Sequence, residues 1–273
     1  MQVATKISAE LRILANEQQA AILSGFFKTG KGEYGEGDRF LGVKVPQTRA
    51  LVKRFHKAAT ITDVDLLTKS GYHEERLAGF LLLIELYNAA AKKNDADTVE
   101  DILSYYLSIL ERGNNWDLVD LVAPKILGDA ILNNKSKEIE SIKLLSSNSL
   151  WKIRTAIVST LPLIKHGDFD LAIDAVTIMK SHEHDLIHKA CGWMLREIGK
   201  KDRNVLTAYL DKYCMQLPRT TLRYAIEHLE PRDRMNYMTR KDEAVRLSRK
   251  GAPENPPAEA IPMSHRLSIH KKN

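Results

Sequence analysis

The three tryptophans of the chain each lie three or four residues before a charged side chain. The pairs are Trp116 with Asp120, Trp151 with Arg154, and Trp193 with Arg196. Residues at this spacing share one face of an α-helix. An indole beside a carboxylate can bind a cationic or flat ligand, and arginines on successive helices can bind the phosphates of a nucleic-acid strand. The alternative is that the tryptophans belong to the hydrophobic core and the charged groups are solvated.

Two other motifs give weaker evidence of a binding site. The glycines of 30–35 fit G-x-G-x-x-G, but a dinucleotide site needs a strand before this motif and a helix directly after it. Here a helical pattern precedes the glycines and more loop follows, so we expect a loop near a ligand. The histidines of 182–188 are close together, but zinc needs a third ligand and H-E-x-x-H is absent. We interpret them as the solvated start of a helix.

Most of the chain has the apolar spacing of α-helices, and the predicted fold class is therefore all-α. The spacing is clear in 72–92, 97–111, 149–164, 168–181 and 185–199. Asp95, Ser149 and Asp168 are candidate N-caps for three of these helices. Residues 28–45 hold five of the 14 glycines and predict a loop, followed by a helix that begins near Pro46.

A weak internal repeat runs through these helices. Arg76, Arg154 and Lys189 are each followed two residues later by a small residue and four residues later by an apolar one. Their spacing suggests units of roughly 35–40 residues and a further unit near residue 115. Such units are typical of a HEAT-like solenoid, a curved array of helix pairs with a long concave face. A generic helical domain is the alternative.

The composition limits the class of protein, and the charges are unevenly distributed along the chain. The chain has 273 residues, of which 44% are apolar and 28% charged, as in ordinary globular proteins. It has no long apolar run and only two cysteines, so we expect a cytosolic protein without disulfides. The net charge is +6, but residues 239–273 hold eight Lys/Arg and four Asp/Glu, which leaves the rest nearly balanced. We expect a domain at 1–238 and a basic, proline-containing flexible tail at 239–273.

Four stretches together resemble the DNA alkylation repair enzymes of the AlkD type, which are HEAT-like DNA glycosylases. They are FLGVKVPQTRAL (40–51), NNWDLVDLVAPKILGD (114–129), LWKIRTAI (150–157) and IHKACGWMLREIGK (187–200). They stand in the family's order, and the resemblance covers residues 10–235. It implies a HEAT-like solenoid whose concave face binds double-stranded DNA.

The resemblance also implies roles for particular residues. The family's essential carboxylate corresponds to Asp120, its two active-site tryptophans to Trp116 and Trp193, and its active-site arginine to Arg154. Candidate DNA-backbone contacts are Arg196, Lys189, Lys44 and Arg49. No metal ion or cofactor is implied. The expected partner is double-stranded DNA that contains alkylated bases, bound by a monomer.

The implied reaction is excision of cationic N-alkylated purines such as 3-methyladenine and 7-methylguanine. A cationic purine is already a good leaving group, so the protein need not protonate it. The carboxylate of Asp120 would stabilise the positive charge that develops on the deoxyribose, and Trp116 and Trp193 would line the lesion. Arg154 would hold a phosphate and orient Asp120. The family leaves the lesion stacked in the helix, unlike glycosylases that flip the base.

Two other functions fit a HEAT-like solenoid. One is a non-catalytic protein that binds damaged or branched DNA. The other is a scaffold for protein interactions. The sequence leaves open the preferred lesion, the role of the loop at 28–45 with its Tyr34, and the function of the tail.

Overall fold

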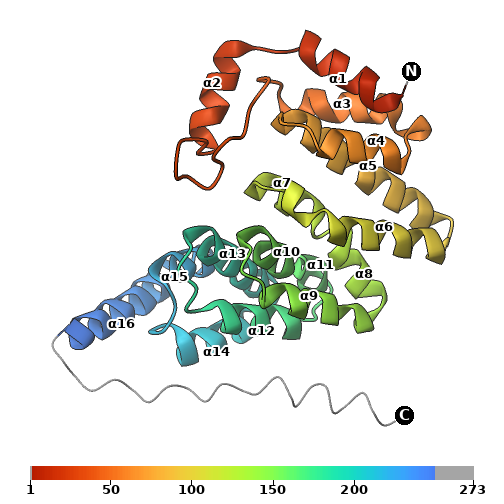
Figure 1. Ribbon diagram of the computed structural model, residues 1–273. Helices are drawn as coiled ribbons and strands as arrows, with labels where there is room; N and C mark the ends of the chain where they lie inside the picture. The colour runs from red at the N-terminus through yellow and green to blue at the C-terminus, as the bar shows by residue number, and fades with distance from the viewer. Residues whose placement is uncertain (1, 250–273) are drawn as a thin grey trace.

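The computed structural model describes residues 2–249 and is built from α-helices, most of them joined by short connections, with one long loop between Phe26 and Val45 (Figure 1). No β-strand forms within these residues, where Arg39 and Tyr72 make an isolated β-bridge. The all-α prediction is therefore confirmed. None of the described helices is long and apolar enough to cross a bilayer.

The helices follow one another in a single series. The first six are α1 (Val3–Ile13), α2 (Glu17–Phe26), α3 (Val45–Phe55), α4 (Ile61–Thr68), α5 (His73–Lys92) and α6 (Ala96–Ser108). The next five are α7 (Trp116–Val122), α8 (Leu127–Asn133), α9 (Glu138–Leu145), α10 (Leu150–Val158) and α11 (Leu161–Lys165). The last five are α12 (Asp170–Met179), α13 (Asp185–Lys201), α14 (Arg203–Tyr213), α15 (Arg219–Ala225) and α16 (Pro231–Arg249). Short 3₁₀ turns occupy His56–Ala58, Leu110–Arg112 and Lys135–Lys137.

The predicted helix boundaries need three corrections. The segment 149–164 forms two helices, because the turn at 159–160 ends α10 and Pro162 lies in the first turn of α11. Asp95 and Ser149 cap their helices, whereas the N-cap of α12 is Phe169 and not Asp168. The boundary expected at 238/239 falls inside α16, so 239–249 is helical. The rest of the expected tail lies outside the described residues.

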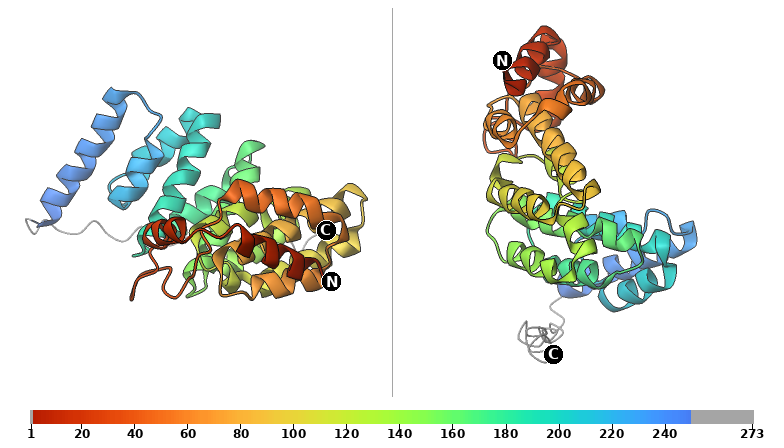
Figure 2. Two further views of the ribbon diagram at one scale, coloured as in Figure 1. Left: turned by 90° about the horizontal axis from the view of Figure 1, so that it is seen from above. Right: turned by 90° about the vertical axis from the view of Figure 1, so that its right-hand side faces the viewer.

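A row of helices in mutual contact carries the repeat. Along this row α5 contacts α7, α7 contacts α10, α10 contacts α13, and α13 contacts α15. Second helices pack beside the row, with α6 on α5, α9 on α10, and α12 and α14 on α13. The repeat anchors Arg76, Arg154 and Lys189 lie on α5, α10 and α13, and the unit expected near residue 115 is α7. The array bends into an arc with a concave side (Figure 2).

Two clusters of buried apolar side chains form the core, and they meet at α7. Leu118 and Val122 belong to the N-terminal cluster, whereas Val119 and Ala123 belong to the C-terminal one. Because successive apolar residues of a helix point in different directions, this short helix is packed on both sides. The polar residues of α7 are thereby held in a fixed orientation between the two halves of the arc.

The stretch 40–46 is fixed to α5 by a buried carboxylate. Glu74 accepts hydrogen bonds from the backbone N–H groups of Leu41, Gly42 and Val43 at 2.9, 2.8 and 3.1 Å. Gly42 has φ +81°, and a Cβ there would lie 2.0 Å from the carbonyl oxygen of Asn16. Only glycine fits this conformation and this close approach. The chain then enters α3 at Val45, next to Pro46, as predicted.

Candidate functional site

Asp120 and Arg154 form an ion pair between α7 and α10. Arg154 Nε donates to Asp120 Oδ1 at 2.9 Å, and Arg154 Nη2 donates to Asp120 Oδ2 at 2.8 Å. The third contact is from Arg154 Nη1 to the backbone carbonyl of Leu186 on α13, at 2.5 Å. The fork of one guanidinium therefore links three consecutive helices of the row. The two residues that the sequence placed 34 positions apart are brought together.

The pair is shielded from solvent but not closed off. The side chain of Arg154 is 6% exposed and that of Asp120 is 19% exposed. Burial raises the pKa of Asp120 above its usual value, the charge of Arg154 opposes this shift, and the carboxylate of Asp117 adds to it. Asp120 thus presents a partly exposed carboxylate whose orientation is fixed by two charge-assisted hydrogen bonds.

Trp116 opens α7 and is partly exposed, and it packs on phenylalanines at the end of α2. Its ring stacks on Phe27 with centroids 5.4 Å apart and meets the edge of Phe26 at 6.0 Å. Asn115 caps the helix, accepting a hydrogen bond from the backbone N–H of Trp116 at 2.9 Å. The indole is therefore held one helical turn before Asp120, as the spacing predicted.

The other two tryptophans differ in their environment. Trp193 on α13 is partly exposed, whereas Trp151 is buried in the C-terminal cluster. Trp151 is thus a core residue, whereas Trp116 and Trp193 pack against the edge of the same cluster and remain partly exposed. The ring of Tyr34 meets the edge of Trp151 at 6.3 Å, so the glycine-rich loop contacts α10. This contact gives Tyr34 a structural position that the sequence left open.

A buried ionic network next to α7 was missed by the sequence analysis. His73, at the start of α5, hydrogen-bonds Asp38 Oδ2 through Nδ1 and Asp117 Oδ2 through Nε2, both at 2.8 Å. Arg76 Nη2 donates to the other oxygen of Asp38 at 2.7 Å. Although burial disfavours the charged imidazole, the hydrogen bonds to Asp117 and Asp38 raise the pKa of His73 to about 9. The four side chains form one connected ionic network, which reaches α7 at Asp117.

One feature of the sequence does indicate this network. Four consecutive ionisable residues, His73 to Arg76, begin a helix that is otherwise apolar on nearly every face, and all four are buried. Charged groups in a helix that is buried all round must be paired. The partners themselves are not readable from the sequence, because Asp38 and Asp117 lie 35 and 44 positions away.

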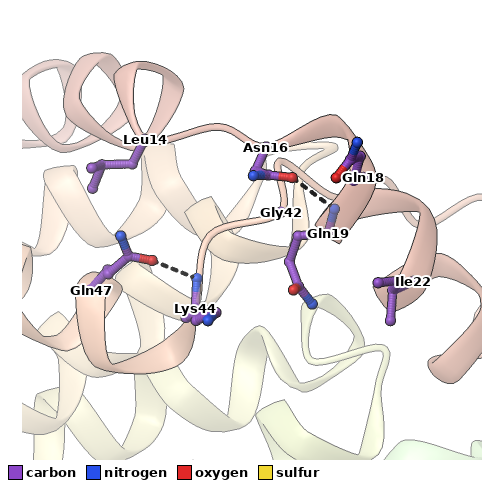
Figure 3. Close-up of a pocket in the computed structure, with 8 residues that line it drawn as sticks. All are labelled: Leu14, Asn16, Gln18, Gln19, Ile22, Gly42, Lys44 and Gln47. Atoms are coloured by element: carbon purple, nitrogen blue, oxygen red, sulfur yellow. Dashed lines mark hydrogen bonds between the residues drawn. The ribbon is translucent and has the colours of Figure 1, made fainter.

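The four candidate DNA contacts occupy different surroundings. Lys189 pairs with Asp185 at 2.9 Å, and Arg196 pairs with Glu227 of the segment after α15. Lys44 directly precedes α3 and Arg49 lies on it, and both side chains are exposed. Within residues 2–249 neither forms an ion pair with a carboxylate. Lys44 lines a hollow of about 360 Å³ together with Asn16, Gln19 and Ile22 (Figure 3). Neither residue contacts the Asp120–Arg154 pair.

The weaker motifs of the sequence form no cluster of their own. Gly30–Gly35 lie in a loop that follows the helix α2, not a strand. His184 is the N-cap of α13 and accepts from the backbone N–H of Leu186, and His188 hydrogen-bonds the carbonyl of His182. Within residues 2–249, no three His, Cys, Asp or Glu side chains are grouped to hold a metal ion.

Comparison with known proteins assigns the chain to a family. No curated protein matches the sequence. Among solved structures, it is similar to a predicted DNA alkylation repair enzyme from Enterococcus faecalis, with a TM-score of 0.63 and 18% sequence identity over 80% of this chain and 97% of that chain. At this identity the likeness shows a shared fold. The profile of the family described as DNA alkylation repair enzyme matches residues 7–229. Because that match spans most of its length, the chain belongs to the DNA alkylation repair enzyme family.

Proposed function

We propose that the protein is a monofunctional DNA glycosylase that releases cationic N-alkylated purines from double-stranded DNA, acting as a monomer in base excision repair. The observation that carries the proposal is the Asp120–Arg154 pair on α7 and α10, with the partly exposed indoles of Trp116 and Trp193 on α7 and α13. Carboxylate, guanidinium and aromatic faces are the groups that a cationic base on a phosphate backbone requires.

Asp120 is the group we assign to the reaction itself. Cleavage of the N-glycosidic bond leaves positive charge on the deoxyribose and releases the purine as a neutral base. A carboxylate held in place before the reaction stabilises this charge at no cost of reorganisation and can orient the attacking water. Two hydrogen bonds from Arg154 hold Asp120 in this orientation. Its carboxylate must be ionised, so activity falls as the pH decreases through its pKa, which burial raises.

Trp116 and Trp193 are the groups we assign to recognition of the cation. An indole attracts a positive charge above its face, and the attraction increases when water is excluded. Both indoles are partly exposed, which suits contact with a lesion that stays in the helix. Discrimination would then rest on charge rather than on the hydrogen-bonding edge of the base.

The test is release of base from a duplex with one 7-methylguanine, in the presence of EDTA, by the wild type and Asp120→Asn. Abasic sites are measured under single-turnover conditions. We expect release by the wild type and a loss of at least about 100-fold in the variant, as for removal of one preorganised electrostatic group. Asp129→Asn is the matched control, because Asp129 is a partly buried carboxylate on α8 bonded to Tyr87.

Binding without release would identify the second function, a non-catalytic DNA-binding protein. In that case the wild type and Asp120→Asn bind the duplex equally well, and neither produces abasic sites. Full activity of Asp120→Asn would instead remove the proposed role of the carboxylate.

A further inference from the structure

Two carboxylates on α7 differ in how their charges are balanced. Asp120 receives two hydrogen bonds from Arg154, whereas Asp117 receives one, from His73 Nε2. The other oxygen of Asp117, Oδ1, is buried and accepts no hydrogen bond within the described part of the chain. Among the described residues, His73 is thus the cation paired with Asp117. Three-residue spacing places Asp117 next to Asp120 on α7.

We propose that His73 is a positioning residue for the site: its imidazolium balances the negative charge of Asp117, which favours the ionised form of the neighbouring Asp120, and it anchors the first turn of the helix that carries Trp116. The inference rests on the proposed function of Asp120. It adds a residue that contacts neither Asp120 nor Trp116 directly.

The network around His73 supports a charged ring. Its side chain is 3% exposed and lies between Asp38, which is 0% exposed, and Asp117, which is 18% exposed. Both ring nitrogens face carboxylate oxygens, and only the imidazolium can donate to both. Arg76 balances Asp38 from α5. With His73 charged, the two cations and two carboxylates sum to zero, and with His73 neutral one negative charge is left beside Asp120.

The remaining charged groups near the two carboxylates are few. Asp120 faces Arg154 on α10 and Asp117 on its own helix. His184, at the start of α13, interacts electrostatically with Arg154. Glu74, which follows His73, is turned toward the backbone of residues 41–43. Of these described groups, His73 is the titratable cation in direct contact with Asp117.

Stacked rings give His73 a second connection to the site. The imidazole stacks on Phe40 with centroids 4.6 Å apart, Phe40 stacks on Phe27 at 5.2 Å, and Phe27 stacks on Trp116 at 5.4 Å. Phe27 also lies 5.1 Å from His73. An imidazolium on an aromatic face adds a cation–π attraction. The backbone of Trp116 is thus held by the helix cap, and its indole ring is held by this stack.

The test measures the ionisation of Asp120 directly. The pH midpoint of its carboxyl ¹³C resonance is recorded in the full-length wild type, His73→Gln, Asp117→Asn and the double variant, together with the pH profile of 7-methylguanine release. We expect His73→Gln to raise the midpoint and the acid limb of base release by about one pH unit, because the charge of Asp117 is no longer balanced. Asp117→Asn lowers the midpoint, and the double variant returns it to the wild-type value or below.

The return of the Asp120 midpoint in the double variant distinguishes an electrostatic role of His73 from a structural one. If His73 only supports the fold, a second substitution in the same network increases the damage, and no midpoint is restored. His166→Gln is the control, because His166 is exposed in the turn after α11. If His73→Gln does not fold, Asp117→Asn alone still decides, since an unchanged midpoint in that variant overturns the inference.

The outcome also separates this inference from the proposed function. A wild type that releases no base, with the Asp120 midpoint shifted as described, contradicts the glycosylase and leaves the role of His73 in place. Base release by the wild type with the same Asp120 midpoint in all four proteins contradicts the role of His73 and leaves the glycosylase in place.

Discussion

Arg154 and Asp120 are joined by two parallel hydrogen bonds, and the same guanidinium also holds the carbonyl of Leu186. These three hydrogen bonds link α7, α10 and α13, the helices that carry the proposed site, without any covalent bond between them. Orientation and charge of Asp120 both depend on it. Variants of Arg154 separate these two contributions.

Arg154→Lys keeps the positive charge and removes the fork. An ammonium cannot donate two parallel bonds to one carboxylate and a third to Leu186, so the carboxylate loses its fixed orientation. We expect single-turnover base release to fall by about 100-fold or more, with weaker effects on DNA binding. Arg203→Lys is the control, because Arg203 forms an exposed ion pair with Asp233. Activity within about twofold of the wild type in Arg154→Lys would show that charge alone is needed.

Arg154→Met removes the cation and leaves Asp120 with no ion partner. Breaking a buried pair in this way costs about 3–5 kcal/mol, because the remaining charge is poorly solvated. The partial exposure of Asp120 places the expected loss at the lower end, about 3 kcal/mol in the free energy of urea unfolding. The double variant Asp120→Asn/Arg154→Met should recover part of this loss. A double variant as unstable as the sum of the two singles would contradict a direct coupling.

The sequence predicted the Asp120–Arg154 site better than the charged network beneath it, and the reason is physical. Asp120, Trp116, Arg154 and Trp193 lie on consecutive helices of a repeat, so a regular spacing and short recognisable stretches place them. Asp38 lies in an irregular loop and its ring partner His73 opens a helix, so no periodicity relates the two. The turn at 159–160 was missed because helix periodicity continues across it.

The tail illustrates a different limit. Residues 239–249 are strongly polar, and a polar segment reads as a flexible extension when taken alone. In the structure, α16 is fixed by contacts with distant residues: Tyr237 is buried and donates to Asp211, and Arg240 pairs with the same carboxylate. Helices stabilised by tertiary contacts of this kind have a weak sequence pattern.

The stability of the protein should depend on pH through His73. Its pKa is raised from 6.5 to about 9 in the folded state, so its contribution is fully present below about pH 6.5 and is lost as the pH rises through about 9. A shift of this size corresponds to about 3 kcal/mol. We expect the difference in unfolding free energy between wild type and His73→Gln to decrease by that amount between pH 6 and pH 10. A difference that stays constant over this range would show that His73 is neutral in the folded protein.

Gly42 should be far less tolerant of substitution than Gly37, although both have φ +81°. In Gly37→Ala the new Cβ meets nothing within 4 Å, so we expect only the cost of a left-handed alanine, about 1 kcal/mol. In Gly42→Ala the Cβ collides with the backbone of Asn16, and the amides bound by Glu74 must move. We expect a loss at least about twice as large, measured by chemical denaturation. Equal losses in the two variants would mean that the backbone at 40–43 adjusts freely.

Phosphate binding by Lys189 would have to compete with Asp185, its partner in the free protein. If Lys189 contacts DNA, Lys189→Gln weakens duplex binding and lowers the slope of log K against log salt by about one unit, because one fewer counterion is released. Asp185→Asn should have the opposite effect on affinity, since the lysine no longer exchanges one partner for another. Lys165→Gln, at the exposed end of α11, is the control for loss of one positive charge. An identical salt slope in Lys189→Gln and the wild type would show that Lys189 contacts no DNA phosphate. The DNA backbone would then be bound by other cations of the arc.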